Sequence, residues 1–267
     1  MNYAVSNIAW PVAEDPEAYE MLSEEGVRHL EIAPPRFWPD LAQVTESEAR
    51  QRARDVEKNG LLVCSFQSLL FGRPDLQVFG EDGGKECRDY LCAICKLAGW
   101  MGAGAMVFGS PKNRLRGTLS LDEATRRAAD FFRFVGDAAV ANGTVLCLEP
   151  NPADYGGDFL LTTQQVAQLV YLVDSPGIRV NLDMGEAIMN EADVARTISD
   201  YLPLAGHFHA SEAMLAPFNA KTPAHRLAAE ALKAADYDGI VSLEMKTPAG
   251  GLPAVHQALL DMRRVYG

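Results

Sequence analysis

The chain has 267 residues, of which 48% are hydrophobic and 22% charged, a composition typical of a folded globular protein with a large core. Its net charge of −12 disfavours nucleic acids and anionic membranes as partners. No apolar run reaches the roughly 18 residues that a membrane-spanning helix needs, and the start of the sequence lacks the pattern of a secretory signal. We therefore expect a cytoplasmic protein.

The five cysteines do not suggest a disulfide framework, because their number is odd and the chain is large. Cys92 and Cys95 form a C-x-x-C pair that could serve redox or metal chemistry. The segment around them, Arg88 to Trp100, is expected to be a buried helix, and no second ligand pair lies nearby in the sequence. A structural role as small buried side chains is therefore the favoured interpretation.

Short apolar runs predict eight strands, at Tyr3–Asn7, His29–Ile32, Leu61–Phe66, Ala105–Phe108, Val145–Glu149, Ile178–Asp183, Ala205–Ala210 and Ile240–Met245. Amphipathic stretches predict eight helices, at Asp15–Glu24, Ser47–Asn59, Lys85–Leu97, Ser120–Ala141, Thr163–Val173, Asp193–Tyr201, Ala224–Ala235 and Leu252–Tyr266. This alternation is typical of parallel βαβ units and favours a closed (β/α)8 TIM barrel, with residues 1–267 as one catalytic domain. An open doubly wound sheet is the alternative, although no Gly-rich phosphate turn follows the first strand.

Four successive predicted strands end on residues that bind metals. They are Glu149, Asp183, His209 and Glu244. In this fold the carboxyl ends of the strands form one rim, which carries the active site. Three carboxylates converging there would repel one another strongly unless a cation lies between them. A single such residue would more readily be explained by a helix cap or an ion pair with arginine, but four in succession favour a metal centre.

A ligand set rich in oxygen with one imidazole suits Mn²⁺ best, with Mg²⁺, Co²⁺ or Zn²⁺ as alternatives. The sequence blocks Leu148–Asn151, Asn181–Gly185, Gly206–Glu212 and Ser242–Glu244 resemble those of the xylose isomerase-like barrels. That group includes ketose 3-epimerases, hydroxypyruvate isomerase and inosose dehydratase, with endonuclease IV as a distant relative. The resemblance runs through essentially the whole chain and places the four metal ligands of the family on the residues named above.

The resemblance implies that the metal binds the oxygens of an α-hydroxy carbonyl compound and stabilises an enediolate. Glu149 and Glu244 match the glutamates that act as base and acid in the family's epimerases. Two positions depart from the family. Glu186 stands where many members have a histidine, and Leu215 where the epimerases tend to have an arginine, and both of those family residues help to hold substrate oxygens. These departures leave the particular sugar and the reaction type open.

Further residues are candidates for contact with the substrate, and they are Glu31, Tyr155, Asp158, Glu186, His207 and Lys246. His207 and Lys246 each lie two residues from a ligand candidate, so strand alternation places them on the same face. For both, an interaction within the protein is an equally good explanation. Four aromatic residues just beyond the early strands could wall the pocket, namely Trp10, Phe37, Trp38 and Phe66. The loop Gly72–Gly84 could be a lid or a contact between copies.

The favoured function is isomerisation or epimerisation of a ketose or keto-sugar derivative. The alternative is a metal-dependent lyase, similar to inosose dehydratase, that uses the same site. A repair nuclease would need a basic groove and many more histidines than the five present. A non-catalytic metal-binding barrel would not need the two glutamates. We thus expect a small carbohydrate as partner, neither nucleic acid nor membrane, and homo-oligomerisation as an open question.

Overall fold

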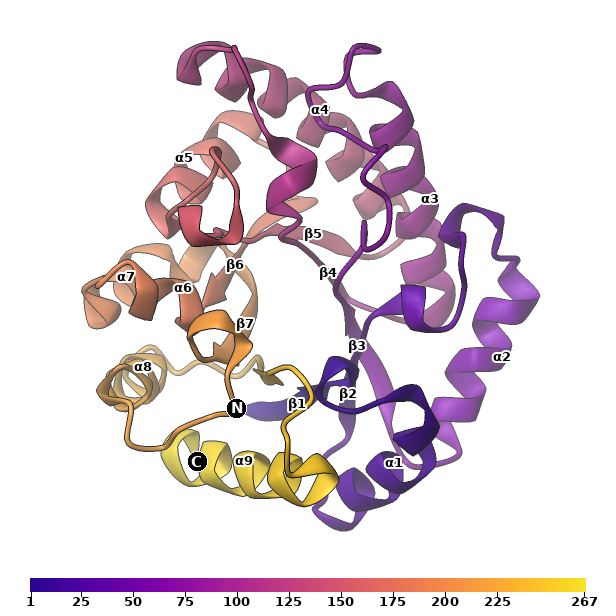
Figure 1. Cartoon of the computed structure of the whole chain (residues 1–267), viewed down its shortest axis with the longest axis vertical. Coiled ribbons are helices and arrows are strands. Elements are labelled where there is room, and N and C mark those ends of the chain that lie inside the picture. Colours follow the sequence, from indigo (N-terminus) through magenta and orange to yellow (C-terminus); the bar gives the residue numbers. More distant parts are fainter.

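Eight parallel strands close into one barrel in the order in which they occur in the chain (Figure 1). A computed structural model describes all 267 residues. The ring closes where β1 pairs with β8, with Asn2 beside Ile240. The strands are β1 (Asn2–Ser6), β2 (His29–Ile32), β3 (Leu62–Phe66), β4 (Ala105–Phe108), β5 (Val145–Leu148), β6 (Ile178–Asp183), β7 (Ala205–Ser211) and β8 (Ile240–Glu244). The predicted TIM barrel is confirmed, and the alternative of an open sheet is wrong.

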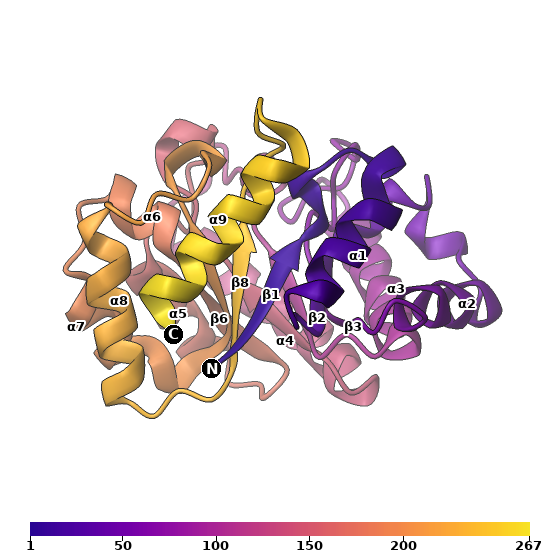
Figure 2. The ribbon, with the colours of Figure 1, turned by 90° about the horizontal axis from the view of Figure 1, so that it is seen from below.

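The helices surround the barrel as an outer layer (Figures 1 and 2). They are α1 (Asp15–Glu24), α2 (Glu46–Glu57), α3 (Lys85–Met101), α4 (Leu121–Ala141), α5 (Thr163–Val173), α6 (Met184–Met189), α7 (Val194–Tyr201), α8 (Pro223–Ala234) and α9 (Gly251–Tyr266). The short helix α6 was not predicted. It starts directly after Asp183, whose Oδ1 accepts a hydrogen bond of 2.7 Å from the backbone N–H of Glu186 and caps the helix.

Local sequence signals set the ends of several helices. The side chain of Thr45 accepts from the backbone of Glu48, and the Glu48 carboxylate accepts in return from Thr45, so α2 begins with a capping box. Ser120 caps α4 by a single bond, in which its hydroxyl oxygen accepts from the backbone N–H of Glu123 at 3.2 Å. The helix α3 ends at Gly102, where φ is +76° and a side chain would be strained.

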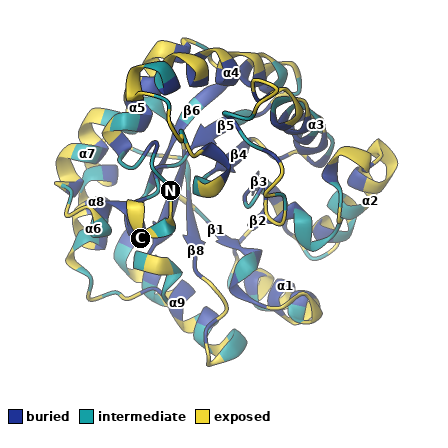
Figure 3. Cartoon of the chain, turned by 45° about the horizontal axis from the view of Figure 1, so that its top comes forward, coloured by how far each residue is buried: buried dark blue, intermediate teal, exposed yellow.

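The strands are buried on both sides, because one face fills the barrel and the other packs against the helices (Figure 3). Buried apolar residues from all parts of the chain form one continuous core. Cys92 and Cys95 lie on α3, with Cys95 fully buried and both thiols free. Burial raises the pKa of the Cys95 thiol to about 12, so this pair has the properties of structural cysteines. None of the helices is both long enough and apolar enough to span a bilayer.

Candidate metal centre

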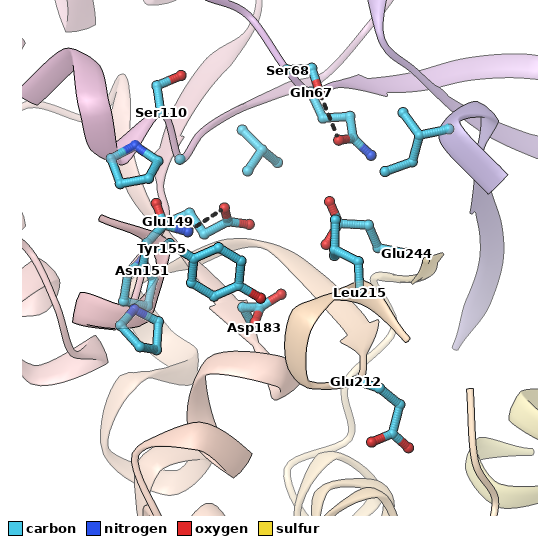
Figure 4. Close-up of a pocket in the computed structure, with 16 residues that line it drawn as sticks. Gln67, Ser68, Ser110, Glu149, Asn151, Tyr155, Asp183, Glu212, Leu215 and Glu244 are labelled. Atoms are coloured by element: carbon cyan, nitrogen blue, oxygen red, sulfur yellow. Dashed lines mark hydrogen bonds between the residues drawn. The ribbon is translucent and has the colours of Figure 1, made fainter. Parts of the chain in front are cut away.

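A cavity of about 190 Å³ opens at the carboxyl ends of the strands. Its wall includes Glu149, Asp183 and Glu244 together with Tyr155 and Leu215. Figure 4 shows the carboxylates of Glu149 and Glu244 facing each other across the cavity. This is the end of a TIM barrel at which active sites are found.

The four predicted ligand residues come together at the bottom of this cavity. Each offers one donor atom, and these atoms lie within 4.8 Å of one another. Nδ1 of His209 lies 3.2 Å from Oε1 of Glu149 and 3.2 Å from Oε2 of Glu244. The Asp183 carboxylate is 3.6 Å from the same nitrogen. The strand ends therefore converge as barrel geometry predicts.

The charge of this cluster is what a divalent cation would balance. Neutral groups contact two of the carboxylates: Asn181 and Asn151 donate to Glu149 at 2.9 and 3.1 Å, and Ser211 donates to Asp183 at 2.7 Å. No lysine or arginine lines the cavity. Three carboxylates thus share one imidazole in a nearly buried site, and the donor set fits Mn²⁺ or a similar ion.

The pKa values in the cluster reflect this crowding. The pKa of Glu244 is raised to about 7, by burial above all and by the charges of Glu149 and Asp183, against the lowering effect of His209. Burial lowers the pKa of His209, but the carboxylates of Glu244 and Glu31 outweigh burial and hold it well above its usual value. Metal binding would therefore displace protons from the cluster.

Glu31 and His207 lie beneath the cavity and not in its wall. Glu31 is fully buried, and its Oε2 lies 2.6 Å from Nε2 of His207 and 3.2 Å from Nε2 of His209. Ser65 donates to the same oxygen at 2.6 Å, and Gln67 donates to the other at 3.2 Å. Glu31 and His207 were expected to contact the substrate, and the structure corrects this expectation. Both side chains are buried and bonded to other protein groups, so they support His209 instead.

Glu186 points away from the cavity and caps α5. Its two carboxylate oxygens accept from the backbone N–H and the hydroxyl of Thr163, at 3.1 and 2.7 Å, and Asn190 donates to it at 2.8 Å. The side chain is only 3% exposed. Its predicted role as a substrate contact is wrong, because α6 starts at once after Asp183 and turns this residue outward.

The remaining predicted contacts divide into two groups. Tyr155 and Leu215 line the cavity, whereas Lys246 and Asp158 do not. The Lys246 side chain is exposed, and Asp158 accepts from the backbone N–H of Arg116 at 2.9 Å, so this carboxylate holds a loop. The hydroxyl of Tyr155 accepts from the backbone N–H of Met214 at 3.1 Å. That bond fixes the turn that carries Leu215 into the wall.

The predicted aromatic wall is also wrong. Trp10 and Phe66 are buried in the core, and none of the four aromatic residues lines the cavity. The indole N–H of Trp10 donates to Asp15 at 2.8 Å. Phe37 packs edge-on against Trp38.

Three residues that support Glu149 were missed from the sequence. Asn181 contacts both Glu149 and His209, and its position two residues before Asp183 on one strand could have revealed it. Arg114 is fully buried and donates to the backbone carbonyl of Glu149 at 2.8 Å, and no pattern in the sequence marks it. Gly109 leaves room for the carboxylate, since a Cβ there would meet Oε2 of Glu149 at 2.4 Å.

The fold and the site together define a TIM barrel with an acidic site that could hold a metal. Residues 19–264 match the family model described as xylose isomerase-like TIM barrel. The chain therefore belongs to this family, as the sequence blocks suggested. No curated protein matches the chain.

Solved structures with the same fold cover essentially the whole chain. One is D-psicose 3-epimerase from Clostridium cellulolyticum H10, at 18% identity and a TM-score of 0.81, covering 100% of this chain and 99% of that one. Another is 3-keto-D-glucoside 4-epimerase from E. coli, at 20% identity and a TM-score of 0.82, covering 99% of each chain. A third is a family 2 AP endonuclease from Brucella melitensis, at 19% identity and a TM-score of 0.76, covering 94% and 97%. At these identities the likeness establishes the fold.

Proposed function

We propose that this protein is an isomerase or epimerase that depends on a divalent metal and acts on a ketose or keto-sugar derivative. One observation carries the proposal: the carboxylates of Glu149 and Glu244 face each other across a cavity whose floor could hold a metal (Figure 4). The names of the epimerases with the same fold support a sugar as substrate. Glu149, Asp183, His209 and Glu244 would hold the ion, with Mn²⁺ as the first candidate.

The two glutamates suit proton transfer at a carbon beside a carbonyl group. A bound divalent cation would polarise the carbonyl and neighbouring hydroxyl oxygens of the substrate and make that carbon more acidic. One glutamate removes the proton, and the other returns a proton on the opposite face to give an epimer, or to the neighbouring carbon to give an isomer. In the metal-free protein the pKa of Glu244 is raised to about 7, mainly by burial, and a bound cation would favour the deprotonated carboxylate that a base needs.

The walls of the cavity favour an uncharged reacting unit. Three carboxylates face it, those of Glu149, Asp183 and Glu244, and no basic side chain lines it. A phosphate or carboxylate on the reacting ring would be repelled there. The same distribution and the net charge of −12 disfavour a nuclease acting on a DNA backbone.

A lyase reaction on the same site is the second candidate. Leu215 and Glu186 provide no polar contact to the substrate where the epimerases tend to have arginine and many family members have histidine, so the fate of the intermediate is less tightly controlled. The proposal is tested by incubating metal-loaded protein in D₂O with a panel of ketoses, 3-keto sugars and inososes. Uptake of deuterium at the carbon beside the carbonyl, abolished when a chelator removes the metal, supports proton transfer. A product with the same heavy atoms as the substrate indicates an isomerase or epimerase, and a product that has lost water indicates a lyase. The absence of deuterium exchange in every sugar would contradict both functions.

A further inference from the structure

A second hollow of about 350 Å³ adjoins the cavity, between the loop after β3 and the loop after β4. Ser68, Ser110 and Pro111 line both spaces, which therefore meet at these three residues. In Figure 4 both serines lie on the same side of the cavity, opposite Asp183 and Glu212. The cavity alone is smaller than the ~300–1,000 Å³ of sites for larger ligands, whereas the two spaces together fall within that range. The available space thus exceeds what one sugar ring needs.

Phe71 lines the hollow and is 78% exposed, more than any other large hydrophobic residue of the chain. Its loop is firmly held, because the side chain of Asn113 donates to the carbonyls of Arg73 and Leu76 at 2.8 and 2.7 Å. Leu70 and Leu76 anchor the same loop in the core. The backbone at Phe71 is thus held in place, while its ring contributes little to the core. An exposed aromatic face beside such a hollow can stack on the C–H face of a sugar.

The junction between the two spaces is strained. Ser68 and Ser110 have φ values of +55° and +43°, in the left-handed region that non-glycine residues seldom adopt. Such strain persists where the surrounding structure holds a site in place, ligand clamps included. The hydroxyl of Ser68 donates to Gln67 at 3.1 Å and still has lone pairs that can accept from a ligand. Polar groups thus lie where a link between two sugar rings would pass.

The charge of the hollow suits a neutral ligand. Arg73 is neutralised by Asp75, with 2.7 Å between Nη2 and Oδ2. Its guanidinium also lies over the ring of Tyr90. Lys112 remains at the exposed edge. The serine hydroxyls and the ring of Phe71 are groups that bind sugar hydroxyls and C–H faces.

We propose that this hollow binds a second sugar ring, so that the preferred substrate is a ketose or keto-sugar unit that carries a glycosyl substituent. The proposal rests on the proposed function, because the reacting ring has to occupy the cavity between Glu149 and Glu244. Phe71 would stack on the second ring, and the junction serines would contact the linkage.

The test compares D-fructose with four of its glucosyl derivatives, turanose, maltulose, leucrose and isomaltulose, which are linked through O3, O4, O5 and O6. The rate of metal-dependent deuterium uptake per substrate concentration is measured for the wild type, Phe71→Ala and Tyr171→Ala. Tyr171 is a matched control because it is 66% exposed on α5 and lies outside both spaces. At least one disaccharide should exceed fructose about tenfold, and Phe71→Ala should lower that ratio at least fivefold while Tyr171→Ala leaves it unchanged.

Equal or better exchange with fructose, or a ratio that Phe71→Ala leaves unchanged, would overturn the second-ring proposal while the proposed function stands. If no sugar exchanges, the proposed function fails, and saturation-transfer NMR then tests the hollow by itself. Contacts to the glucosyl protons that Phe71→Ala abolishes would support a sugar subsite, and their absence in the wild type would overturn it. If Phe71→Ala changes only the molar mass of the protein in solution, as measured by light scattering, Phe71 is instead a contact between copies of the chain and the second-ring proposal fails.

Discussion

Glu31 and His209 form a carboxylate–imidazole pair in which the two nitrogens of His209 face different partners. Nε2 lies 3.2 Å from the buried Glu31 carboxylate, and Nδ1 faces the three carboxylates of the candidate metal centre. A carboxylate on the far nitrogen holds the imidazole in the tautomer and orientation that a metal requires. The orientation of His209 thus depends on Glu31 of β2, which is far away in the sequence.

Glu31→Gln should therefore weaken Mn²⁺ binding by about 10- to 100-fold, because the amide supports His209 less well than a carboxylate. Isothermal titration calorimetry of metal-free protein measures this directly. Glu25→Gln is the matched control, since Glu25 also contacts a histidine, His256 at 2.7 Å, on the outside of the barrel. Equal affinities for Glu31→Gln and wild type would show that Glu31 does not support the metal.

Metal binding should be weaker at low pH. In the metal-free protein the pKa of Glu244 is raised to about 7 and that of His209 is raised above its usual value, so both groups hold protons that the metal must displace. Affinity should fall as pH decreases below about 7, by about tenfold per unit for each proton released. Calorimetry at pH 6 in two buffers of different ionisation enthalpy would reveal the proton release, and a pH-independent affinity would contradict it.

The raised pKa values also bear on stability. Since Glu244 binds its proton more tightly when folded, its contribution to the stability of the metal-free protein is present below the ordinary carboxyl pKa of 4.5 and is lost as pH rises through about 7. The same sign holds for His209. In the metal-bound protein this loss of stability does not occur. The increase in the free energy of unfolding on metal binding should therefore be greater at pH 8 than at pH 5.

Gly109→Ala should lower activity about 100-fold, because its Cβ would lie 2.4 Å from Oε2 of Glu149 and displace that carboxylate. Gly104→Ala is the control in the turn before β4, since its Cβ would meet nothing closer than 3.9 Å. Turnover of the substrate identified by deuterium exchange measures both. An active Gly109→Ala variant would mean that Glu149 tolerates displacement.

Arg114→Met should destabilise the fold by about 3 kcal/mol, because it removes charged hydrogen bonds to buried acceptors. The guanidinium donates to the carbonyl of Glu149 at 2.8 Å and to the amide oxygen of Asn151 at 2.9 Å. Arg50→Met, on the exposed face of α2, should change stability by less than about 0.5 kcal/mol. Urea denaturation compares the two, and equal small effects would show that Arg114 is not an anchor.

The sequence predicted the barrel and the convergence of four strand ends, because both depend on local patterns and on one geometric rule of the fold. Glu149, Asp183 and Glu244 each end an apolar run, and parallel strands in a barrel bring such ends together. The orientation of other side chains depends on distant partners. Glu31 ends up below the site, where the register of β2 against β3 shifts. Glu186 turns outward because Thr163, on another helix, offers it two donors.

The proposed function requires Glu149 and Glu244 to transfer protons on opposite faces of the substrate. The most direct test measures deuterium uptake and net conversion in D₂O for Glu149→Gln and Glu244→Gln, with metal content determined for each. Both variants should lose net conversion by about 10²- to 10⁴-fold. The variant that keeps the proton-removing glutamate should still exchange deuterium into recovered substrate. Conversion at the wild-type rate by either variant, with metal bound, would contradict proton transfer by these two glutamates.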